Sequence, residues 1–92
     1  MTDRQSPGPE KQIGPLTAGI GVEVWLHEAA TEHGTRLYRT VTLSPRRIVN
    51  MTTGEWENCE GYYLDDVPAL IFALQKVQEF AFEKPIPALK PN

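Results

Sequence analysis

The fold is decided by residues 20–43, which read IGVEVWLHEAATEHGTRLYRTVTL. Apolar and polar residues alternate over 20–28, and this period of two is typical of a strand with one buried face. The alternation returns over 36–43. The polar stretch between them, 29–35, contains Gly34 and is short enough for a hairpin loop. The segment therefore predicts two antiparallel strands joined by that loop.

Two weaker strand signals follow. Ser44-Pro45 ends the second strand, because Pro cannot donate a hydrogen bond into a ladder. Residues 46–51, around Ile48 and Val49, predict a third strand. A turn is expected at 52–54, and residues 56–64 predict a fourth strand in which the alternation is less clear.

A helix is predicted over residues 65–82. Asp65 or Asp66 can accept the free amide hydrogens at its start, and Pro68 lies in the first turn, where its missing N–H costs nothing. Apolar residues recur at three- and four-residue steps, namely Val67, Leu70, Ile71, Leu74, Val77 and Ala81, with Ala73 and Phe80 beside them. The predicted fold class is α+β: a four-stranded antiparallel β-sheet followed by one C-terminal amphipathic helix.

Composition predicts three segments in this chain. Residues 1–19 hold three prolines and three glycines with few apolar residues, so they are expected to form a disordered tail. Residues 20–84 form the ββββα domain, and residues 85–92, with three more prolines, an extended tail. A domain of this size is marginal alone. Because residues 67–82 have more apolar positions than one small sheet can cover, we expect a homodimer through this helix.

Composition also excludes several classes of function. The 92 residues carry nine basic and twelve acidic side chains, and the net charge of -3 argues against binding polyanions through bulk charge. Cys59 is the single cysteine, which excludes a disulfide framework and a multi-cysteine metal site. The sequence has no secretory signal and no apolar run of membrane-spanning length. We therefore expect a cytoplasmic protein with no membrane partner.

Catalytic and metal-binding motifs are also missing from the sequence. His27 and His33 are six residues apart across a predicted loop, whereas the zinc-protease motif needs two His four apart on one helix. Asp65 and Asp66 are better explained as helix caps than as an acid–base pair. Cys59 has acidic neighbours, which oppose its use as a nucleophile. We expect no enzyme activity, no metal and no cofactor.

The strongest functional signal is a segregation of charge. Residues 36–47 contain no acid and four arginines, Arg36, Arg39, Arg46 and Arg47. Residues 55–66 contain no base and five acids, Glu55, Glu57, Glu60, Asp65 and Asp66. Arginine pairs with phosphate and stacks on bases, while Tyr38 and Trp25, on the solvent side of adjacent strands, would add aromatic rings. Such a surface is typical of a platform that binds single-stranded nucleic acid.

A structural interpretation of the same residues stays open. The basic strands could pair with the acidic fourth strand, so that the two charge blocks neutralise each other across the ladder. Trp25 and Tyr38 would then only cap a sheet edge. Arg39 falls on the apolar side of its strand, so it lies either beyond the covered part of the sheet or at a bulge that re-aims it.

A family resemblance covers residues 22–82. Residues 61–70, which read GYYLDDVPAL, run from a strand end into the helix, and a Trp-containing loop at 55–57 precedes them. This order of elements resembles the single-stranded-DNA-binding transcriptional coactivators of the positive-cofactor-four type. The resemblance implies a homodimer whose helices pack together, with curved sheets that form a channel for unpaired strands. The family has Lys and Arg between the Trp and the Gly, where residues 57–60 of this chain read ENCE.

The sequence thus favours a non-enzymatic, transcription-associated protein that binds single-stranded DNA or RNA. The four arginines would contact phosphates, and Trp25, Tyr38 and Trp56 would stack on bases. The alternative is an acidic protein-interaction or accessory module that keeps the fold, does not bind nucleic acid and meets a basic protein partner.

Overall fold

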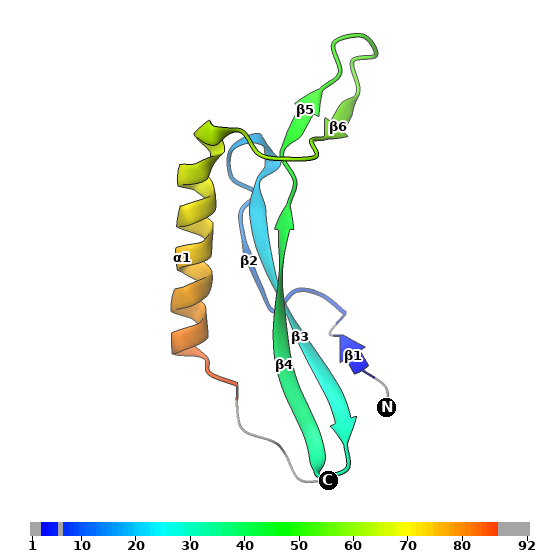
Figure 1. Ribbon diagram of the computed structural model, residues 1–92, viewed down its shortest axis with the longest axis vertical. Helices are drawn as coiled ribbons and strands as arrows, with labels where there is room; N and C mark the ends of the chain where they lie inside the picture. The colour runs from blue at the N-terminus through cyan, green and yellow to red at the C-terminus, as the bar shows by residue number, and fades with distance from the viewer. Residues whose placement is uncertain (1–2, 6, 87–92) are drawn as a thin grey trace.

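The computed structural model describes residues 3–5 and 7–86 and shows an α+β protein with antiparallel sheets and one C-terminal α-helix (Figure 1). The predicted fold class is confirmed at this level. In chain order the elements are β1 (Asp3–Gln5), β2 (Lys11–Ile13), the 3₁₀ turn η1 (Thr17–Gly19), β3 (Gly21–Thr31), β4 (Gly34–Ser44), β5 (Arg47–Val49), β6 (Trp56–Asn58), the 3₁₀ turn η2 (Leu64–Asp66) and α1 (Val67–Glu83).

The β3–β4 hairpin is the largest element. Its strands have 11 residues each and stay paired over their whole length, so the turn consists of Glu32 and His33 alone. The Thr31 hydroxyl donates to the carbonyl oxygen of Gly34 at 2.6 Å, and Gly34 has a φ of 131°, which favours glycine. The two strands were predicted correctly, but the loop predicted over 29–35 is too long, because the ladder extends into it from both sides.

β1 and β2 pair with the edge of β3 that β4 leaves free. β2 sets Ile13 opposite Val22, and Ile13 is only 9% exposed. Gly21 permits the close approach of the two strands, because a Cβ at this position would lie only 2.8 Å from the carbonyl oxygen of Ile13. The prediction of a disordered tail over 1–19 is therefore wrong, since a three-residue run between prolines suffices for a paired edge strand. Of the tail expected over 85–92, all but the first two residues lie outside the described residues.

β5 and β6 form a separate two-stranded sheet, which projects beyond the end of the long hairpin (Figure 1). Val49 of β5 lies opposite Trp56 of β6. The prediction of four consecutive strands in one sheet is wrong, because Pro45 has no N–H to donate and interrupts the first ladder. The strand expected over 56–64 is also shorter and ends at Asn58.

α1 lies along one face of the main sheet (Figure 1). Ala73 packs in the core with Ile13 and Val22, and Val77 packs against this cluster. Phe80 is also buried, so the stripe that faces the sheet follows positions 73, 77 and 80. Much of the predicted stripe is instead exposed, namely Val67, Ile71, Leu74 and Ala81. The helix turns its Ala73 side to the sheet because this small side chain permits the closest approach.

The start of the helix is held by one carboxylate. Asp66 accepts the backbone N–H of Tyr63 at 2.7 Å, across the η2 turn that leads into α1. Pro68 lies in the first turn of α1, as predicted. Asp66 therefore caps η2, but its side chain makes no capping hydrogen bond to α1, so the expectation that it accepts the free amide hydrogens of this helix is wrong. Asp65 is exposed.

Candidate nucleic-acid interface

The register of β3 and β4 divides the hairpin into two faces, because directly opposed residues share a face. α1 covers the face that contains Val22. The opposite face, which we call the open face, carries the side chains of Glu23, Trp25, His27, Arg36, Tyr38, Thr40 and Thr42. The expected aromatic residues of β3 and β4 thus lie together, on the face that the helix does not cover.

Three aromatic rings stand in the middle of the open face. The rings of His27 and Tyr38 stack, with centroids 4.8 Å apart and planes 8° apart. The indole N–H of Trp25 donates to the hydroxyl of Thr42 at 3.0 Å, and Nε2 of His27 lies 2.8 Å from the hydroxyl oxygen of Thr40. These contacts hold the rings in place, so little side-chain entropy remains to be lost on binding a ligand.

The open face has the groups that stacking requires. Its three rings are half-buried and leave part of their surface in contact with solvent. Arg36 is exposed two residues before Tyr38 and on the same face, where its guanidinium can meet a phosphate. Sequence reasoning did not include His27 in the site, although His27 follows Trp25 at the two-residue period of one strand face.

Arg39 lies on the helix-covered face. It donates to both carboxylate oxygens of Glu10, at 2.8 Å each, and to the carbonyl oxygen of Lys84 at 2.6 Å. Its guanidinium carbon lies 4.8 Å from the centroid of the Phe80 ring. The ladder is unbroken at this position, so no bulge re-aims the side chain. Arg39 therefore joins β4 to the N-terminal segment and to the end of α1, and these contacts replace its expected role at a phosphate.

The Arg39–Glu10 pair predicts a pH dependence of stability. Its hydrogen bonds hold the pKa of Glu10 below the ordinary value and raise the pKa of Arg39. The stabilisation is therefore present above the unfolded-state pKa of a glutamate, about 4.3, and is lost as the pH falls through the lower folded-state pKa. Glu10→Gln is expected to reduce the free energy of unfolding by about 1 kcal/mol at pH 7.

Urea unfolding at several pH values measures this difference. The gap between wild type and Glu10→Gln should shrink below about pH 4. Glu60→Gln, at an exposed loop position, is the matched control and should leave stability unchanged. A gap that stays constant down to pH 2 would contradict the assignment.

Arg46 lies at the junction between the two sheets. It forms an ion pair with Asp66, which is 2% exposed, and its guanidinium carbon lies 4.1 Å from the centroid of the Tyr63 ring. Its Nε is buried and has no hydrogen-bond partner among the described residues. Arg46 therefore fixes the start of the helix to the sheet and is not exposed as a phosphate-binding group.

Arg47 and Trp56 belong to the projecting hairpin. Arg47 is exposed, and its stem covers Gly19, where a Cβ would lie 2.8 Å from the Arg47 Cγ. Trp56 is 62% exposed. The seven residues predicted as one site are thus distributed over three places: Trp25, Arg36 and Tyr38 on the open face, Arg39 and Arg46 in packing contacts, and Arg47 and Trp56 on the second sheet.

The acidic segment is mostly exposed. Its exposed members are Glu55, Glu57, Glu60 and Asp65, at and after the projecting hairpin. Within the described residues, Asp66 is the one acid of this segment that pairs with an arginine. Neutralisation between the two charge blocks is therefore limited to one ion pair, and it is not a cross-strand pair of the ladder.

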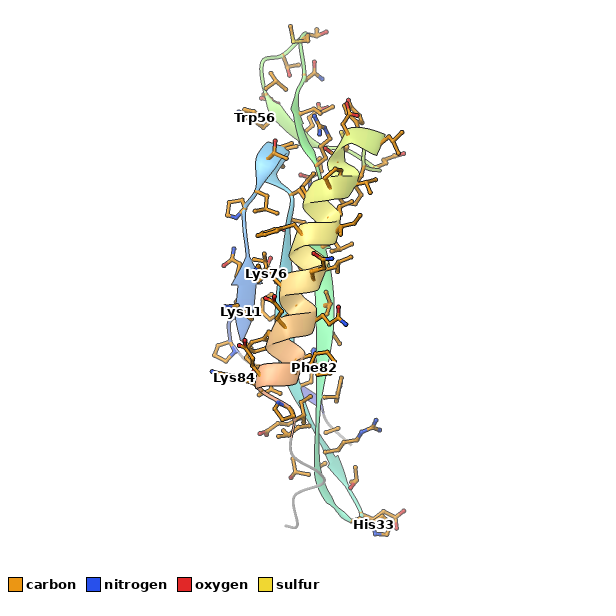
Figure 2. All side chains as sticks on the ribbon, turned by 90° about the vertical axis from the view of Figure 1, so that its left-hand side faces the viewer. Lys11, His33, Trp56, Lys76, Phe82 and Lys84 are labelled. Carbon is orange, nitrogen blue, oxygen red and sulfur yellow. The ribbon has the colours of Figure 1, made fainter. Side chains whose placement is uncertain are left out.

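One cavity among the described residues is small. A shallow cavity of about 110 Å³ lies between β2 and α1, where Figure 2 shows Lys11 and Lys76, and is lined by Lys11, Ile13, Lys76, Glu79, Phe80 and Glu83. Organic ligands usually occupy about 300 to 1,000 Å³, so this cavity is too small for them. No cluster of three or more His, Cys, Asp or Glu that could hold a metal ion occurs within residues 3–5 and 7–86.

The described part of the chain has no helix that is both long and apolar enough to cross a membrane. No protein-family model, no curated protein and no solved structure matches the chain.

Proposed function

We propose that the protein binds single-stranded DNA or RNA on its open face and has no enzymatic activity. The observation that carries this proposal is the row of Trp25, His27 and Tyr38 on one uncovered sheet face, held by stacking and by threonine hydroxyls. Stacking of a base on an aromatic side chain contributes about 1 to 3 kcal/mol and tolerates any base sequence. A sheet face of this kind can therefore hold unpaired bases without reading their identity.

Electrostatics contributes little to this binding. The chain has a net charge of -3, and the contacts of Arg39 and Arg46 leave Arg36 as the arginine of the open face. Each phosphate contact with a single strand contributes a slope of about -0.7 to the dependence of log affinity on log salt. We expect a slope of about -0.7 for one protomer, much shallower than four contacting arginines would give.

Fluorescence anisotropy with a labelled 20-nucleotide deoxythymidine strand at low salt tests the proposal. Trp25→Ala is expected to weaken binding by about 5- to 150-fold, the equivalent of one lost stacking contact. Tyr38→Ala should act in the same direction. Trp56→Ala is the matched control, because this exposed ring lies on the other sheet, and it should change affinity less than twofold. Duplex DNA should bind more weakly, because its base faces are covered.

Two results would overturn this function. One is the absence of measurable binding by the wild type. The other is unchanged affinity in the Trp25→Ala, Tyr38→Ala double variant, provided that circular dichroism shows the native fold.

An acidic interaction module is the second candidate. The observation that favours it is the exposure of Trp56 and of its neighbour Glu55 on the projecting hairpin, with Glu60 exposed just after the hairpin ends. An aromatic anchor within an acidic rim is suited to a basic protein partner. This candidate becomes the better account if the wild-type protein fails to bind the single strand.

We further infer that the working unit is a homodimer of about 20 kDa, twice the chain mass of 10.3 kDa. The support for this inference is the apolar surface that α1 leaves uncovered, including Ile71, Phe72 and Phe82. Several large apolar side chains exposed on one helix are typical of an interaction surface.

A further inference from the structure

The open face carries one acid beside its aromatic rings. Glu23 precedes Trp25 by two residues on β3, so the two side chains share this face about 7 Å apart. Arg36 lies opposite Ala29, six positions along the strand from Glu23, which is about 20 Å away. A carboxylate next to a stacking ring repels phosphates. Glu23 is therefore suited to a part of the ligand other than its phosphates, which Arg36 can contact at the other end of the face.

The carboxylate of Glu23 is half-buried and has no partner within the described part of the chain. Neither a hydrogen bond nor an ion pair joins it to a described residue. Its neighbours across the two ladders are Gln12 on β2 and Thr42 on β4. A carboxylate only accepts hydrogen bonds, and removing it partly from water without a donor costs free energy. The Glu23 carboxylate is thus available to accept hydrogen bonds from a ligand.

The indole ring of Trp25 reaches toward the Glu23 end of the open face. Trp25 lies opposite Thr40, yet its Nε1 donates to the hydroxyl of Thr42 at 3.0 Å. Thr42 in turn lies opposite Glu23. The N–H edge of the indole is therefore at the Glu23–Thr42 pair, and a base stacked on this ring has one edge beside the carboxylate. An unpaired base can present its Watson–Crick edge there, because no complementary strand covers it.

Guanine is the base whose Watson–Crick edge fits a carboxylate. This edge has two adjacent donors, N1–H and the N2 amino group, which match the two oxygens of one carboxylate. Adenine and cytosine each have one amino donor beside a ring nitrogen that accepts. Thymine and uracil have one N–H between two carbonyl oxygens. In these four bases an acceptor would face the negative charge of Glu23, so guanine is favoured.

We propose that Glu23 makes the open face selective for a guanine stacked on Trp25 in single-stranded DNA or RNA. The carboxylate accepts hydrogen bonds from N1–H and from the N2 amino group of this guanine. The stacked rings of His27 and Tyr38 hold a neighbouring base of any identity. The inference rests on the proposed function, since it assigns a base specificity to that same surface.

Fluorescence anisotropy with 20-nucleotide DNA strands tests this selectivity. An all-thymine strand is compared with a strand in which guanine replaces every third thymine. A bidentate contact with a base edge discriminates by about 5- to 150-fold, and one binding register in three uses it, so the wild type should bind the guanine strand about 2- to 50-fold more tightly. Glu23→Ala should reduce this preference to less than about twofold and leave all-thymine binding unchanged or slightly stronger. Glu28→Ala is the matched control, an exposed glutamate of β3 on the helix side of the sheet, and should keep the preference.

Two further strands test the inference in the wild type alone. They carry adenine or hypoxanthine in place of each guanine, and both purines stack as guanine does. Adenine lacks the N1–H and hypoxanthine lacks the N2 amino group, so both strands should bind more weakly than the guanine strand. Equal affinity for the guanine strand and the all-thymine, adenine or hypoxanthine strand, or a guanine preference that persists in Glu23→Ala, overturns the role of Glu23 alone. Failure of the wild type to bind any of the strands overturns the proposed function and this selectivity with it.

Discussion

Deletion of residues 1–15 is expected to unfold the protein. The deletion removes β2, the buried side chain of Ile13 and the Glu10 carboxylate that pairs with Arg39. Removing a buried Ile side chain alone costs about 2 to 5 kcal/mol, and small domains have only about 5 to 15 kcal/mol of total stability. Loss of β2 would also open the edge of β3 beside Val22. We expect no cooperative thermal transition by circular dichroism.

Point variants in β2 separate the effect of packing from that of chain length. Ile13→Ala should lower the free energy of unfolding by about 3 kcal/mol. Gln12→Ala, at an exposed position of the same strand, should change it by less than about 0.5 kcal/mol. If the deleted chain melts cooperatively at the wild-type midpoint, the N-terminal strand does not contribute to the core.

The hairpin could be predicted because the alternation of apolar and polar residues repeats over many residues of both strands. Eleven-residue strands show five periods, and the same alternation placed Trp25 and Tyr38 on the solvent side. β2 could not be predicted in this way, because a run of three residues cannot show a period. Its role depends on Ile13 fitting over Gly21, which is a tertiary contact that the local sequence does not specify.

The orientation of α1 illustrates a different limit. Apolar residues occupy so much of the helix circumference that several stripes satisfy a three- and four-residue spacing. Which stripe faces the sheet is decided by closeness of approach, which favours the Ala73 side. The stripe of larger residues, such as Ile71 and Leu74, was the natural prediction in a helix that has one partner surface. Their exposure is what the proposed dimer would remove.

The arginines show why residue type alone does not define a site. Arg39 was recognised from the alternation as an unusual charge on the apolar face, but its partner Glu10 lies in a segment expected to be disordered. Arg46 pairs with Asp66 across 20 residues of sequence. Each pairing is long-range, so charge density in the sequence overestimated the number of arginines free to bind phosphate. The placement of Trp25 and Tyr38 on one sheet face needed no such information, because the alternation along each strand gives it.

Replacing Asp66 is expected to cause the largest effect of any single charged residue. Its carboxylate pairs with Arg46 and accepts the N–H of Tyr63, and the residue is 2% exposed. Removing one partner of a fully buried pair costs about 3 to 5 kcal/mol; because the Arg46 side chain keeps 22% of its exposure, we expect about 2 to 3 kcal/mol for Asp66→Ala. Urea unfolding followed by circular dichroism measures this change.

Three further variants separate the contributions of Asp66. Asp66→Asn retains an oxygen for the Tyr63 N–H but not the charge, so it should cost less than Asp66→Ala. Asp65→Ala, at the exposed neighbouring position, is the control and should change stability by less than about 0.5 kcal/mol. Adding Arg46→Met to Asp66→Ala should recover part of the loss, because no unpaired guanidinium then remains at the junction. Equally small losses of stability in Asp65→Ala and Asp66→Ala would show that the ion pair does not hold the helix to the sheet. Additive losses of stability in the Asp66→Ala, Arg46→Met double variant would show that the two side chains act independently.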